Sequence, residues 1–204
     1  MKKIFLAVSA FLFMSSALGF LTIHETAEIM PANLYKIGFA PQLLISDGGG
    51  LNVDVYADMH LMDDVDGRMT IGAGKTDFTT QASVKWVPFP DYDRQPAMGL
   101  RGAVGYAGFA GLNLFDIQIT PLISKKADTR YGHMIPYVGL PITYISSTKV
   151  SSYTATQFTV GAEWFPRSDR HIGGELNLNM NNSISSISVF FSFPFEASTG
   201  YIKH

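Results

Sequence analysis

The chain has 204 residues, of which 47% are hydrophobic, 13% aromatic and 16% charged, and its formal net charge is −2. An average globular domain is about 25% charged, so the composition excludes a disordered chain and is unusual for a soluble surface. The near-neutral charge, without a long run of Lys or Arg, argues against nucleic acid as a partner. The sequence has no cysteine, which excludes disulfides, thiolate metal sites, cysteine nucleophiles and iron–sulfur clusters.

Residues 1–19 have the three-part pattern of a secretory signal peptide. Two lysines near the start precede an apolar run at residues 4–14, and small residues follow. The run is shorter than the roughly 20 residues that a membrane-spanning helix needs, which argues against the alternative of an uncleaved anchor. We therefore expect cleavage after Ala17 or Gly19, and a single domain over residues 20–204.

The rest of the chain alternates apolar and polar residues with a period of two, which is typical of β-strands. In the clearest segment, Leu51, Val53 and Val55 share one face, whereas Asn52 and Asp54 share the other. Ten such segments are separated by runs rich in Gly, Pro, Asn, Asp and Ser, and they predict one all-β domain. The segments are Tyr35–Ile45, Leu51–Leu61, Met69–Ala73, Phe78–Trp86, Met98–Tyr106, Phe115–Ile123, Met134–Tyr144, Phe158–Trp164, Ile172–Met180 and Ile187–Phe195.

Three features favour a membrane barrel, with the apolar face toward lipid, over a soluble barrel with the apolar face inward. The polar faces contain mainly small residues and a few charges of both signs, which suits a narrow lumen. Many segments have the length of a tilted transmembrane strand. Aromatic residues also gather near the segment ends, as in interfacial girdles. These residues are Tyr35, Trp86, Phe89, Tyr106, Phe109, Tyr144, Tyr153, Trp164, Phe165 and Phe195.

The sequence predicts an antiparallel meander closed into a transmembrane β-barrel of 8–10 strands. Prolines are the main obstacle to this prediction, because each lacks the N–H that a ladder hydrogen bond needs. Pro41, Pro121, Pro136 and Pro141 all fall inside expected strands.

A signal peptide, alternating strands and an aromatic last strand together resemble the Gram-negative outer-membrane β-barrel class. In that class an alternating aromatic pattern in the last strand directs insertion. Here Val189, Phe191, Phe193 and Phe195 are in phase, although Pro194 interrupts them and residues 196–204 follow. The resemblance implies a location in the cell outer membrane, with outer-membrane lipid and the barrel-assembly machinery as partners. It implies neither a cofactor nor a nucleic acid.

The charged residues of the polar faces predict a network of ion pairs in the lumen, because buried charges need partners. Two carboxylates and an imidazole on one strand face, Asp54, Asp58 and His60, could instead serve in acid–base chemistry or bind a metal. We expect no catalytic and no metal site. The predicted lumen network consists of Lys36, Asp54, Asp58, His60, Lys85, Arg101, Asp116, Glu163 and Glu175.

A second acidic group, Asp63, Asp64 and Asp66 before Gly67, is favourable for calcium but lacks the ligand spacing of a known calcium loop. We interpret it as a turn rich in aspartate.

The sequence therefore predicts a small barrel with a structural or interaction role and a filled or very narrow lumen. One alternative is an outer-membrane lipid-active hydrolase, in which His171 and Glu175 act with Ser186 or Ser188 of the last strand. The other alternative is a soluble periplasmic barrel that holds an apolar ligand.

Overall fold

The computed structural model describes residues 22–46, 49–109, 111–149, 151–167, 169–196 and 200–201. The predicted signal peptide, residues 1–19, lies outside the described residues. Within these ranges no helix is long and apolar enough to cross a membrane.

All regular elements of the described chain are β-strands. The strands are β1 (Leu34–Leu44), β2 (Gly50–Met62), β3 (Val65–Gly74), β4 (Phe78–Phe89), β5 (Ala97–Phe109), β6 (Leu112–Ser124), β7 (Ala127–Thr129), β8 (Gly132–Gly139), β9 (Ile142–Ser147), β10 (Tyr153–Arg167), β11 (Arg170–Asn181), β12 (Ser186–Glu196) and β13 (Gly200–Tyr201).

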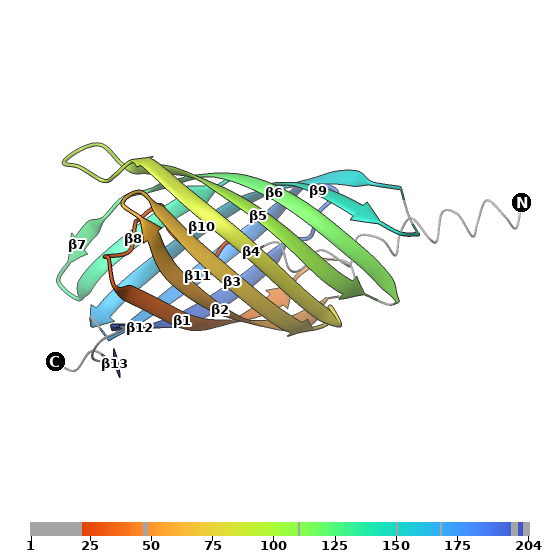
Figure 1. Cartoon of the computed structure of the whole chain (residues 1–204), viewed down its shortest axis with the longest axis horizontal. Helices are drawn as coiled ribbons and strands as arrows, with labels where there is room; N and C mark the ends of the chain where they lie inside the picture. The colour runs from red at the N-terminus through yellow and green to blue at the C-terminus, as the bar shows by residue number, and fades with distance from the viewer. Residues whose placement is uncertain are drawn as a thin grey trace, which may run out of the picture.

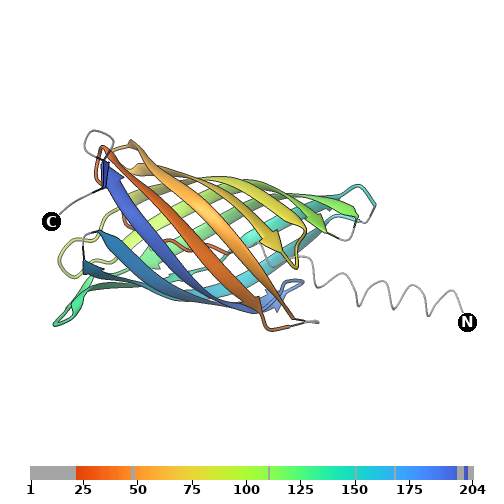
Figure 2. The ribbon, with the colours of Figure 1, turned by 90° about the horizontal axis from the view of Figure 1, so that it is seen from below.

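The strands form a closed antiparallel barrel of ten wall strands, strongly tilted against its long axis (Figure 1). β8 and β9 together make one wall strand, because both pair with β6 on one side and β10 on the other. Pairing of β1 with β12 closes the barrel, and these two strands lie side by side in Figure 2. The predicted fold class is confirmed, and each of the ten predicted segments falls on one wall strand.

On the wall strands most outward-facing side chains are apolar and most inward-facing side chains are polar. On β2, Leu51, Val53 and Val55 are 57%, 43% and 44% exposed, whereas Asn52 and Asp54 are buried. This is the inverse of a soluble barrel. The alternative of a soluble barrel with an apolar interior is therefore wrong for these strands.

Aromatic residues hold the closing seam between β1 and β12. Phe39 stacks on Phe191 with ring centroids 5.0 Å apart, and Tyr35 stacks on Phe195 at 5.7 Å. Pro194 pairs with β1, but the pairing of β12 with β11 ends at Ser192, before Pro194. The proline therefore interrupts no ladder between β12 and β11.

The prolines inside strands lie where a ladder is already interrupted. Pro141 lies in the break between β8 and β9, and Pro121 faces this break, accepting a hydrogen bond from Leu140 N at 3.2 Å. Pro136 accepts one from Lys125 N, also at 3.2 Å. Pro41 lies in a gap of the β1–β12 ladder, while its pairing with β2 continues.

We call the end of the barrel where β1 begins and β12 ends the proximal mouth, and the opposite end the distal mouth. Just inside the distal mouth, apolar side chains from five wall strands and from the β11–β12 turn pack together. This distal cluster consists of Leu44, Ala107, Leu114, Ile145, Ala155 and Ile184.

Three predicted girdle residues do not belong to a lipid-facing ring. Phe109 and Tyr153 pack against the distal cluster in the interior. Phe165 lines a cavity at the proximal mouth.

Candidate functional site

The segment Thr22–Asn33, which precedes β1, lies inside the barrel and leads to the proximal mouth. Its first residues are fully enclosed, with Ile23 and Ala27 at 1% and 0% exposure. These two side chains pack with Val87 and other interior residues of the wall. We refer to Thr22–Asn33 as the luminal segment.

Three cations on adjacent strands face the luminal segment. Arg68 of β3, Lys85 of β4 and Arg101 of β5 point inward and are buried, and we call them the cationic row. Arg68 Nη1 donates to two main-chain carbonyls at 2.8 and 3.0 Å, and Lys85 Nζ donates to two others at 3.0 and 2.6 Å. The four carbonyls belong to Ile23, His24, Thr26 and Glu28.

Glu25 is the residue of the luminal segment whose side chain meets the cationic row. Its Oε1 accepts a hydrogen bond from Arg101 Nε at 2.8 Å, and its Oε2 lies 3.5 Å from Lys85 Nζ. Gln118 and Gln81 accept one hydrogen bond each from Nη1 and Nη2 of Arg101, at 2.5 and 2.6 Å. Each nitrogen of the buried guanidinium therefore donates to a partner, as a buried charge requires.

Glu175 of β11 bonds the luminal segment through main-chain N–H groups. Its two carboxylate oxygens accept from Ile23 N at 3.1 Å and from His24 N at 2.7 Å. The carboxylate is itself held by the Tyr137 hydroxyl at 2.7 Å and by Asn177 Nδ2 at 2.9 Å. The position of this acceptor is thus fixed by groups on β8 and β11.

Two more wall groups accept hydrogen bonds from the luminal segment. Ser124 Oγ accepts from Ala27 N at 3.2 Å, and Asp66 Oδ2 accepts from Met30 N at 3.1 Å. Among the described residues, no backbone-to-backbone hydrogen bond joins the segment to a strand other than Leu34 N to Pro31 O at the start of β1. Wall side chains therefore hold the segment, and no strand ladder includes it.

A second group of charges lies beside the cationic row. Asp58 accepts two hydrogen bonds from Arg68, at 2.5 and 2.8 Å, and Lys36 Nζ lies 3.2 Å from Asp58 and 3.6 Å from Glu163. The Arg68 guanidinium also stacks 4.2 Å above the Tyr56 ring.

Most of the predicted lumen residues are connected through Arg68, Asp66 and the luminal segment, and fewer of them pair directly with one another. Lys36, Asp58 and Glu163 lie together, whereas Lys85, Arg101 and Glu175 contact the luminal segment. His60 Nδ1 lies 3.4 Å from Asp66 Oδ1. Asp54 and Asp116 are buried beside Gly72 and Gly105, and no cation of the described chain forms an ion pair with either.

The residues of the predicted hydrolase site are not assembled. His171 Nδ1 bonds Glu163 Oε1 at 3.1 Å, while Glu175 binds the luminal segment. Ser188 Oγ lies 2.8 Å from Nε2 of His24, and Glu175 Oε1 lies 3.9 Å from the same nitrogen. A catalytic triad places serine and acid on opposite ring nitrogens, so this arrangement lacks the required geometry.

The acidic turn does not gather its carboxylates either. Asp66 points into the lumen, whereas Asp64 accepts a hydrogen bond from Trp86 Nε1 at 2.6 Å on the outside. In the described parts of the chain, no group of three His, Asp or Glu side chains is arranged to hold a metal ion.

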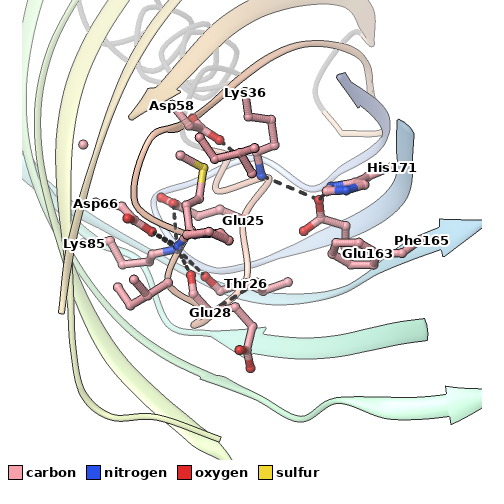
Figure 3. Close-up of a pocket in the computed structure, with 15 residues that line it drawn as sticks. Glu25, Thr26, Glu28, Lys36, Asp58, Asp66, Lys85, Glu163, Phe165 and His171 are labelled. Carbon is pink, nitrogen blue, oxygen red and sulfur yellow. Dashed lines mark hydrogen bonds and ion pairs between the residues drawn. The ribbon is translucent and has the colours of Figure 1, made fainter. Parts of the chain in front are cut away.

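A cavity of about 100 Å³ lies beside the luminal segment at the proximal mouth (Figure 3). Both polar groups and apolar side chains line it, so it is suited to a few water molecules. Its lining includes Glu28, Met30, Asp66, Phe165 and His171.

Sequence reasoning missed the lumen roles of Arg68, His24 and Glu25, and it assigned Asp66 to a turn rich in aspartate, whereas the structure buries Asp66 in the lumen. Arg68 comes directly before the predicted segment Met69–Ala73 and continues its inward face, so extending the alternation by one residue would have found it. The luminal segment has no periodicity, and its sequence carries no signal for a place inside the barrel.

No family model and no curated protein matches this chain. Among solved structures it is similar to a de novo designed transmembrane β-barrel (10% identity, 81% of this chain and 98% of the other, TM-score 0.43). It is also similar to the translocator domain of autotransporter NalP from Neisseria meningitidis (11% identity, 80% and 89% covered, TM-score 0.45). A third is the N-terminal β-barrel domain of Pseudomonas aeruginosa OprF (11% identity, 81% and 100% covered, TM-score 0.39).

The fold and the distribution of side chains define the class of protein. A closed antiparallel barrel leaves no strand edge unpaired, carries apolar side chains on its outer face and buries its charges inside. These are the properties of a transmembrane β-barrel.

Proposed function

We propose that the chain is a small outer-membrane β-barrel protein with a structural or interaction role, exported after cleavage of residues 1–19. The observation that carries this proposal is the apolar outer face, which only a lipid environment satisfies at this extent. Outer-membrane lipid and the barrel-assembly machinery are the partners we propose. The aromatic row of β12, which packs on β1 at the seam, is the element that the machinery would recognise.

The proposed role does not include bulk transport. The distal cluster packs inside the lumen near one mouth, and the luminal segment lies in the lumen toward the other. A barrel of this size leaves little space beyond its own side chains. We therefore propose a non-catalytic barrel with a closed lumen.

The test combines cell fractionation with heat-modifiability and conductance. We expect the protein in the outer-membrane fraction, faster migration on SDS gels before boiling than after, and no stable conductance step in planar lipid bilayers. Recovery from the soluble periplasm without a gel shift would overturn the membrane assignment. Stable pores in the intact protein would overturn the closed lumen.

A further inference from the structure

The lumen presents hydrogen-bond donors and acceptors to the backbone of the luminal segment. The cationic row on β3–β5 binds main-chain carbonyls, while Glu175 on β11 binds main-chain N–H groups. Ser124 and Asp66 accept from two further N–H groups. These hydrogen bonds are made to main-chain N–H and C=O groups, which every peptide has. They therefore allow a peptide of another sequence to bind in the lumen.

One contact depends strongly on sequence. Glu25 is bonded to Arg101 and lies beside Lys85, and both cations are buried. A peptide that places a neutral side chain here leaves Arg101 without its anionic partner. The site therefore selects an acidic residue at this position.

The luminal segment can leave without breaking the pairing of the wall strands. It takes part in no strand ladder, so its release breaks no pairing between strands. The distal cluster lies toward the other end of the lumen, whereas the cavity of about 100 Å³ lies beside the segment at the proximal mouth. Among the described residues, the proximal mouth therefore offers an accessible space next to the segment.

We propose that this lumen is a binding socket for an acidic peptide, and that the luminal segment occupies it as a ligand in cis. The inference rests on the proposed function, since it needs a closed barrel with a filled lumen. It adds the chemical class of the partner, namely a peptide with a carboxylate at the position of Glu25.

The experiment uses the full chain, folded in detergent, and a fluorescent peptide with the sequence of residues 22–33. Binding is measured by fluorescence anisotropy for wild type, Glu25→Gln and the matched control Glu28→Gln. Glu28 is in the same segment, but its carboxylate pairs with the half-exposed Lys126 at 2.7 Å. A scrambled peptide and a peptide with Gln at the position of Glu25 test sequence dependence.

We expect the native peptide to bind Glu25→Gln about tenfold more tightly than wild type, because the weakened cis ligand competes less. The Glu28→Gln variant should bind the native peptide as wild type does. The scrambled peptide and the peptide with Gln at the position of Glu25 should bind Glu25→Gln at least about tenfold more weakly than the native peptide does. Equal binding to wild type and Glu25→Gln, or equal binding of the scrambled peptide, would overturn the socket.

Heat-modifiability of each variant separates the two proposals. If the protein shows the gel shift but binds no peptide, the proposed peptide-binding socket is wrong and the proposed barrel stands. If wild type shows no gel shift, the proposed membrane barrel is wrong. If Glu25→Gln does not fold, a double variant, Ala27→Cys with Ser124→Cys, replaces it and is designed to form a disulfide between the segment and the wall. The two positions are close, since Ala27 N lies 3.2 Å from Ser124 Oγ, and the chain has no other cysteine. Peptide should bind the reduced form and not the oxidised form, and equal binding to both contradicts the proposal.

Discussion

The hydroxyl of Tyr137 on β8 reaches across β10 to bond Glu175 on β11, with an O–O distance of 2.7 Å. Gly161 of β10 makes this possible, because it is the register partner of both residues. Its missing side chain leaves room for the Tyr137 ring to lie across the strand. Glu175 in turn bonds the luminal segment, so a glycine in the wall helps to position a group in the lumen.

Replacing Gly161 by Ala should destabilise the barrel. The new Cβ would collide with the Tyr137 ring, and moving the ring breaks the bond to Glu175. We expect a loss of about 1–3 kcal/mol, as for other overpacked interiors. Urea unfolding followed by tryptophan fluorescence measures the change. Gly102→Ala is the matched control, since a Cβ there meets nothing within 4 Å, and a similar loss in both variants would argue against this mechanism.

Replacing Arg68 by Gln should be more damaging. The change removes two hydrogen bonds to Asp58 and two to carbonyls of the luminal segment, all in the buried lumen. Breaking a buried ion pair in this way typically lowers stability by about 3–5 kcal/mol. Urea unfolding followed by tryptophan fluorescence measures this loss of stability as well.

Arg170→Gln provides the control for the Arg68 variant. Arg170 pairs with Asp169 at 3.1 Å, but its side chain is 47% exposed. Surface pairs contribute about 0–1 kcal/mol. If both arginine variants unfold at the same urea concentration, the buried network does not stabilise the barrel.

A charge on the outer face should impair insertion into lipid. Val104 of β5 is 57% exposed and points away from the lumen, near the middle of its strand. Arginine at the bilayer midplane costs about 2–4 kcal/mol. We expect Val104→Arg to fold poorly into lipid vesicles, as judged by the gel shift. Tyr92→Arg, in the β4–β5 connection, should fold normally, and equal yields would place Val104 outside the membrane.

The β4–β5 connection should loosen in acid. Burial raises the pKa of the Asp91 carboxyl, but hydrogen bonds from Lys125 Nζ and Lys126 N outweigh this and hold the pKa below its usual value of 3.8. A lowered carboxyl pKa stabilises the folded form above the usual value, and this contribution is lost as the pH falls through the lowered pKa.

A spin label at Arg94→Cys reports on this connection by electron paramagnetic resonance. We expect the label to become more mobile as the pH falls below about 4, the usual aspartate pKa. In the Asp91→Asn background the label should be mobile at every pH. A label that is equally ordered in both backgrounds would show that the tether through Lys125 is unimportant.

The fold was predictable because lipid and a polar lumen lie on opposite faces of each strand. Leu51–Leu61 shows the resulting alternation without interruption, and its faces are assigned correctly. The segment Met69–Ala73 was predicted as a strand, but β3 is longer and spans Val65–Gly74. The prediction was too short because the glycines at positions 67, 72 and 74 do not contribute to the hydrophobic alternation.

The arrangement inside the lumen was much less predictable. Alternation shows that Asp54 and Asp58 both point inward, but not that Asp58 meets Arg68 while Asp54 lies beside Gly72. Such pairings depend on register and tilt across several strands. The partner of Arg101 is Glu25, which belongs to a segment without periodicity, and only the three-dimensional structure brings these two residues together.

The position of the luminal segment also constrains the order of assembly. Closure pairs Phe39 with Phe191, residues from opposite ends of the barrel sequence, so the seam can form only when the last strand arrives. Until then the strands form an open sheet, and the luminal segment can bind to its inner face from the side. After closure, the same segment can enter only by threading through a mouth, so refolding should become slow whenever the seam closes first.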